Sequence, residues 1–91
     1  MTLIYIKLSD MKELDELGNK LDAALAAKEE ALNAGEGPTT TQLSLLANRR
    51  RDIAGFREMA ARAFDGAAER KTVVDNFTKS AMEIINEIQA I

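Results

Sequence analysis

A seven-residue spacing of apolar side chains runs through the second half of the chain and constrains its fold more than any other feature. The positions that share this spacing are Leu46, Ile53, Ala60, Ala67, Val74, Ala81 and Ile88. A second line, three residues further along, holds Arg49, Phe56, Ala63, Arg70, Phe77, Ile84 and Ile91. Such a repeat is typical of helices that pack against other helices. We therefore predict an all-α protein with a helical seam formed by Leu46, Ile53, Val74, Phe77, Ile84 and Ile88.

The pair Asp65-Gly66 is the only break signal inside this repeat. If a helix ends there, helices over 10–34, 40–65 and 67–90 have similar lengths, which favours a small three-helix bundle running up, down and up. If the helix continues, residues 40–90 form one long C-terminal helix of about 75 Å, at 1.5 Å per residue, in a helical hairpin. The matched lengths favour the bundle, whereas the uninterrupted register favours the long helix.

Capping residues mark the expected helix boundaries. Asp10 with Glu13 resembles a capping box, and Thr39 with Gln42 predicts the start of the next helix. Between them, Gly35-Glu36-Gly37-Pro38 ends the first helix. The apolar stripe of that helix contains Met11, Leu14, Leu17, Leu21, Ala24, Leu25 and Leu32. Gly18 interrupts it, at a cost of about 1 kcal/mol relative to alanine.

The residues before this helix are β-branched, aliphatic and aromatic, which predicts a short strand over Thr2–Leu8. We therefore expect a strand-like lead-in over 1–9 and a single helical domain over 10–91. Because the sequence holds no second strand signal, the strand would pair with a copy of itself through Ile4, Tyr5 and Ile6, or join a partner's sheet. The alternative is an extended lead-in that covers the end of the bundle.

Composition excludes several classes of function. The chain contains no histidine and no cysteine, and its formal net charge is −3. General acid–base catalysis usually needs histidine or a carboxylate in a cleft, and the carboxylate pairs of this chain lack the Glu-x-x-His element of dimetal sites. No apolar run approaches the ~20 residues of a membrane span. We predict a cytoplasmic protein that is not an enzyme, has no catalytic residue, metal or cofactor, and does not bind membranes.

Charge is divided between the helices. Acidic residues dominate 10–34, whereas arginines dominate 40–65, so the two helices should attract one another. The arginines also form a candidate docking surface for an acidic protein, with phenylalanine as its apolar anchor. The candidate partner-binding residues are Arg49, Arg50, Arg51, Arg57, Phe56 and Phe64.

Short segments resemble known families. The expected strand followed by Ser9 and Asp10 resembles the start of ribbon-helix-helix DNA-binding proteins, which implies a strand-paired dimer, although the first helix here is longer. Leu14 to Phe64 is similar to the helical-hairpin chaperones of type III secretion needles, and Thr72 through Ile85 resembles the C-terminal helix of the needle subunits. Small phage-encoded proteins that assemble a particle or block a host complex share these features.

We therefore expect a protein–protein interaction or assembly protein that acts through its apolar helical seam, with another protein or a second copy as partner. It would be a small adaptor, a secretion-type chaperone or assembly subunit, or a phage-encoded inhibitor. The alternative is a nucleic-acid-binding regulator of ribbon-helix-helix type. Nucleic acid is the disfavoured partner, because the net charge is negative.

Overall fold

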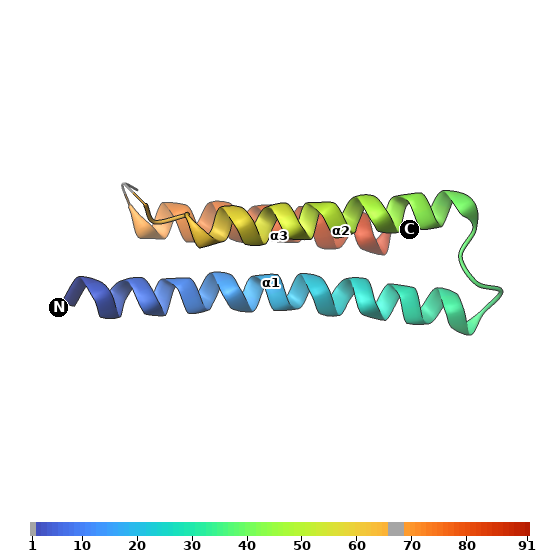
Figure 1. Cartoon of the computed structure of the whole chain (residues 1–91), viewed down its shortest axis with the longest axis horizontal. Helices are drawn as coiled ribbons and strands as arrows, with labels where there is room; N and C mark the ends of the chain where they lie inside the picture. The colour runs from blue at the N-terminus through green and yellow to red at the C-terminus, as the bar shows by residue number, and fades with distance from the viewer. Residues whose placement is uncertain (1, 66–68) are drawn as a thin grey trace.

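Three helices make up the described part of the protein. The computed structural model describes residues 2–65 and 69–91, with side chains from residue 11 onward. The helices are α1 (Thr2–Ala34), α2 (Thr40–Ala61) and α3 (Arg70–Gln89), and they run up, down and up in a bundle of 54 × 17 × 16 Å. Figure 1 shows α1 along one side, with α3 lying behind α2. No strand is present among the described residues, so the prediction of an all-α three-helix bundle is confirmed.

The predicted strand at the N-terminal end is wrong. Helix α1 begins at Thr2 and crosses the expected boundary at residue 9, so Asp10 is not a cap. A lone strand leaves its backbone N–H and C=O groups without partners, whereas a helix bonds them within the segment. Extending an existing helix also avoids the cost of nucleation. The start of α1 extends past the end of α2 (Figure 1), and strand pairing through Ile4, Tyr5 and Ile6 has no basis in this fold.

The loop between α1 and α2 follows the sequence prediction. Gly37 has a φ of +85°, a conformation that favours glycine, and its N–H donates to the carbonyl of Leu32 over 3.0 Å. Thr39 is the N-cap of α2: its hydroxyl accepts from the Gln42 N–H over 3.1 Å. In return, the Thr39 N–H donates to Gln42 Oε1 over 2.9 Å, which completes the capping box.

Replacing Thr39 with alanine is expected to lower the free energy of unfolding by about 1 kcal/mol, because the Gln42 N–H loses its acceptor. Urea unfolding followed by circular dichroism measures this loss. Thr41→Ala is the matched control, because Thr41 is an exposed residue inside the first turn of the same helix. Equal losses for the two variants would contradict a capping role for Thr39.

The connection between α2 and α3 excludes one continuous helix. Helix α2 ends at Ala61, four residues before Asp65, and the next residues form turns. The N–H of Arg62 donates to the carbonyl of Met59 over 3.1 Å, and the N–H of Ala63 donates to that of Ala60 over 3.2 Å. These i to i−3 bonds tighten and end the helix. The long C-terminal helix is therefore wrong, whereas the predicted residues Gly66 and Ala67 lie outside the described part.

The core lies between all three helices. Its buried side chains are Leu14, Leu21, Leu25, Leu46, Ile53, Phe56, Ala81 and Ile88. Three of the predicted seam residues, Leu46, Ile53 and Ile88, are thus covered by the protein itself. The other three, Val74, Phe77 and Ile84, are half-buried. Half of the seam predicted from the seven-residue spacing is therefore buried in the core.

Hydrogen bonds fasten the C-terminal end of α3 to both other helices. Lys28 Nζ from α1 donates to the carbonyl of Gln89 over 3.1 Å. Gln42 Nε2 from α2 donates to the carbonyl of Ile91 over 3.3 Å. Both acceptors lie at the end of α3, where carbonyl groups have no partner within the helix. This end of the bundle is therefore closed by side chains of the neighbouring helices.

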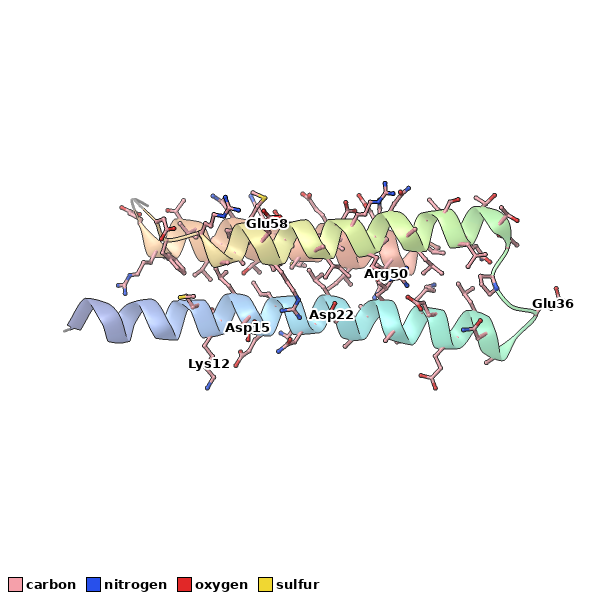
Figure 2. All side chains as sticks on the ribbon, in the orientation of Figure 1. Lys12, Asp15, Asp22, Glu36, Arg50 and Glu58 are labelled. Atoms are coloured by element: carbon pink, nitrogen blue, oxygen red, sulfur yellow. The ribbon has the colours of Figure 1, made fainter. Side chains whose placement is uncertain are left out.

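Ion pairs join α1 to α2, as the division of charge predicts. Arg57 donates to Asn19 Oδ1 over 2.9 Å and to Asp22 Oδ2 over 2.5 Å, and its guanidinium lies 3.4 Å from Asp15. Arg50 contacts Glu29 at 2.5 Å. Figure 2 shows Asp22 and Arg50 on the facing sides of the two helices. The arginines of α2 therefore hold the acidic helix α1 in register.

Candidate protein-binding groove

A groove runs between α2 and α3 on the face that α1 does not cover. Its volume is about 590 Å³, and its apolar floor is formed by Phe56, Phe77 and Ile84. A smaller hollow of about 380 Å³ shares Met59 and Phe77 with it and continues past the end of α2 to Ala63. We call these two together the α2–α3 groove.

Two aromatic rings shape the floor of the groove. Phe56 and Phe77 meet edge to face, with ring centroids 5.3 Å apart and ring planes at 80°. Phe56 is buried, but Phe77 is only half-buried and also lies against the core. Edge-to-face contact of this kind stabilises the pair by about 0.5–1.5 kcal/mol beyond area burial. The floor is therefore a fixed apolar surface that already exists in the free protein.

Gly55 and Met59 form the α2 side of the groove. A Cβ atom at Gly55 would meet nothing within 4 Å, so the backbone of α2 is open to an approaching group there. Met59 is 66% exposed, the most exposed of the large hydrophobic side chains described. A flexible thioether beside a fixed aromatic floor is a common feature of surfaces that accept apolar side chains.

Each rim of the groove carries one exposed charged side chain without an ion-pair partner among the described residues, whereas Asp52, also on the α2 side, lies 3.1 Å from Arg49 Nε. Arg51 lies on the α2 side, whereas Glu83 lies on the α3 side together with the polar Asn76 and Ser80. Neither Arg51 nor Glu83 has an ion-pair partner among the residues that the structure describes, and both are exposed. They contrast with Glu58, further along α2, which pairs with Arg62 at 2.9 Å.

The candidate arginines do not form one docking surface. Arg49 contacts Glu87 of α3 and has its Nε 3.1 Å from Asp52, without hydrogen-bond geometry between them. Arg50 and Arg57 are engaged with α1 instead. Of the candidates Arg49, Arg50, Arg51 and Arg57, only Arg51 lines the groove without an ion-pair partner among the described residues. The three consecutive arginines thus point in three different directions, towards α3, towards α1 and to the rim of the groove, because helical spacing turns each by about 100°.

The two candidate phenylalanines have different positions. Phe56 lies in the groove floor, whereas half-buried Phe64 lies in the turn after α2 and does not line the groove. Sequence reasoning missed Gly55, Met59 and Glu83. A signal for Met59 was present, because it follows Phe56 by three residues and therefore shares its side of the helix.

Other features of the described residues give weaker support for a functional site. A hollow of about 350 Å³ between α1 and α2 is lined by Arg57 and Asp15, which already interact with each other. No cluster of acidic side chains in residues 11–65 and 69–91 has the arrangement of a metal site. Over residues 2–65 and 69–91, no helix is both long enough and apolar enough to cross a membrane.

Comparison with known proteins gives no match: no family model, no curated protein and no solved structure is similar to this chain.

Proposed function

We propose that this chain is a non-enzymatic interaction protein that binds another polypeptide in its α2–α3 groove. The observation that supports this proposal is the apolar floor of Phe56, Phe77 and Ile84, left open beside a Met59 that is 66% exposed. Half of the seam that the sequence singled out is buried inside the bundle, and its residues Phe77 and Ile84 line the groove, where they remain available to a partner. Adaptors, secretion chaperones and assembly subunits all act through surfaces of this kind.

A helix suits the groove better than a small ligand. The groove consists of two adjoining hollows between antiparallel helices, and its floor residues are large and apolar. An amphipathic helix fills such a channel with side chains at i, i+3, i+4 and i+7. The polar residues along both rims would then meet the edges of the incoming apolar face. The ribbon-helix-helix alternative loses its support, because the strand on which it depends is replaced by α1.

Site-specific photo-crosslinking in the cell of origin tests the proposal. A photoreactive residue placed at Met59 is expected to crosslink to a polypeptide, because this side chain borders the groove. The matched control is Met82, which is also on the surface, with 59% exposure, but does not line the groove. Identification of the adducts by mass spectrometry gives the partner.

The outcomes are distinct. Crosslinking from position 59 and not from position 82 supports the groove as a binding surface. Absence of any adduct at position 59, or equal adducts at both positions, would remove the basis for the proposal.

A further inference from the structure

We propose that the occupant of the α2–α3 groove is the α2–α3 groove of a second copy of this chain. The inference rests on the proposed function, since it identifies the partner for that same groove. In this homodimer, the two-fold axis lies between the facing grooves and runs along them, and Arg51 of each copy meets Glu83 of the other. The charges on the rims of the groove carry the argument.

Two contacts place Arg51 and Glu83 in the same section of the bundle, at similar heights. Helices α2 and α3 are antiparallel, and Arg49 contacts Glu87 on one side of this level. On the other side of it, the rings of Phe56 and Phe77 are 5.3 Å apart. Arg51 and Glu83 lie between these two contacts in their respective helices, and both line the groove. Arg51 and Glu83 thus lie on opposite sides of the floor.

A two-fold axis parallel to the groove places the α2 rim of one copy opposite the α3 rim of the other. It leaves each residue at the same height along the bundle. It therefore sets α2 of one copy opposite α3 of the other, and Arg51 opposite Glu83 at two symmetric points. An axis across the helices would instead place α2 against α2 and α3 against α3, so Arg51 would not meet Glu83. Contact between opposite charges favours association, so the pairing of Arg51 with Glu83 selects the first arrangement.

Apolar contacts supply the remainder of the interface. In the proposed dimer, Met59, Phe77 and Ile84 of one copy lie opposite the same floor of the other. Gly55 leaves space for these side chains, because a Cβ there would contact nothing within 4 Å. The four helices then form an apolar layer between two bundles, and each α1 stays on its own outer side.

Charge reversal tests the inference through a mixing experiment. Alone, Arg51→Glu and Glu83→Arg each place like charges at both contact points. Each is expected to raise the dissociation constant of the homodimer roughly tenfold or more, as sedimentation across a concentration series would show. When the two variants are mixed, both contact points regain opposite charges. The mixture is expected to form a heterodimer about as stable as the unmodified homodimer.

A different position supplies the matched control. Arg62→Glu reverses a charge at the C-cap of α2, at a different height of the groove. Mixing it with Glu83→Arg leaves like charges at one of the two contact points, so it should restore less stability than mixing Arg51→Glu with Glu83→Arg. Circular dichroism of every variant establishes that the bundle is folded. If Arg51 and Glu83 instead paired within one chain, a single chain that carries both Arg51→Glu and Glu83→Arg would recover its folding stability. The mixture of the two single variants would then not form a heterodimer.

The results separate this inference from the proposed function. An unmodified chain that stays monomeric at all concentrations, while position 59 crosslinks to a different protein, would overturn the dimer and leave the binding groove in place. A dimer that the charge reversals do not weaken would overturn the proposed symmetry. Preferential heterodimer formation by the mixed variants establishes the contact between Arg51 and Glu83.

Discussion

Replacing Ile88 with alanine is expected to lower the free energy of unfolding by about 2–5 kcal/mol. The Ile88 side chain is 1% exposed and belongs to the core cluster in which α3 meets α1 and α2. Truncation removes buried methyl groups and leaves a cavity that a thin core cannot close. Because domains of this size are stable by only about 5–15 kcal/mol, this single change removes a large share of the total.

Urea unfolding followed by circular dichroism measures this loss as a lower midpoint with an unchanged slope. Met82→Ala is the matched control on the same helix, since Met82 is exposed, and its effect is expected to stay within about 0.5 kcal/mol. If Ile88→Ala and Met82→Ala shift the midpoint equally, the seven-residue register does not face the core.

The sequence predicted the parts of the fold that depend on local spacing. A seven-residue repeat fixes which side of a helix is apolar, and three of the six residues on the predicted seam, Leu46, Ile53 and Ile88, are buried. The Thr39 cap was predictable for the same reason, since its partner is only three residues away. Patterns of this kind need no knowledge of what the helix packs against.

Features that depend on contacts between distant segments of the chain were not predictable from the sequence. The residues of 2–8 prefer strands individually, but without a second strand their backbone groups are satisfied only by joining α1. The groove is a second case: Phe77 and Ile84 were recognised as apolar, but their spacing does not say that one side remains open. Only the arrangement of α2 and α3 shows that Met59 and Gly55 border that opening.

The role of Gly18 is a third feature that the sequence did not predict. In the sequence, a glycine inside a helix is a weak point that alanine would improve. In the structure, Gly18 is buried, and a Cβ there would lie 2.8 Å from Nη1 and 3.4 Å from Cγ of Arg57. The absence of a side chain allows Arg57 to lie across α1 and reach Asn19 and Asp22. Gly18 therefore makes room for the contact that joins the two helices.

Gly18→Leu is consequently expected to lower the free energy of unfolding by about 1–3 kcal/mol, through overpacking and displacement of the Arg57 guanidinium. Gly55→Ala is the matched control, because Gly55 is also inside a helix but has open space at the Cβ position. That control is expected to raise the free energy of unfolding by about 0.5–1 kcal/mol. The opposite signs distinguish packing against Arg57 from helix propensity, which favours the larger residue at both positions.

A double-mutant cycle assigns the effect to Arg57. In a background that carries Arg57→Ala, the space above Gly18 is free, so Gly18→Leu should lose most of its penalty. The coupling free energy between the two positions is then about 0.5–3 kcal/mol, the range found for residues in direct contact. Unfolding of the four variants in urea measures it at one temperature and protein concentration. Additive effects would mean that Gly18 does not hold the Arg57 side chain in place, and that the α1–α2 register depends on the apolar core alone.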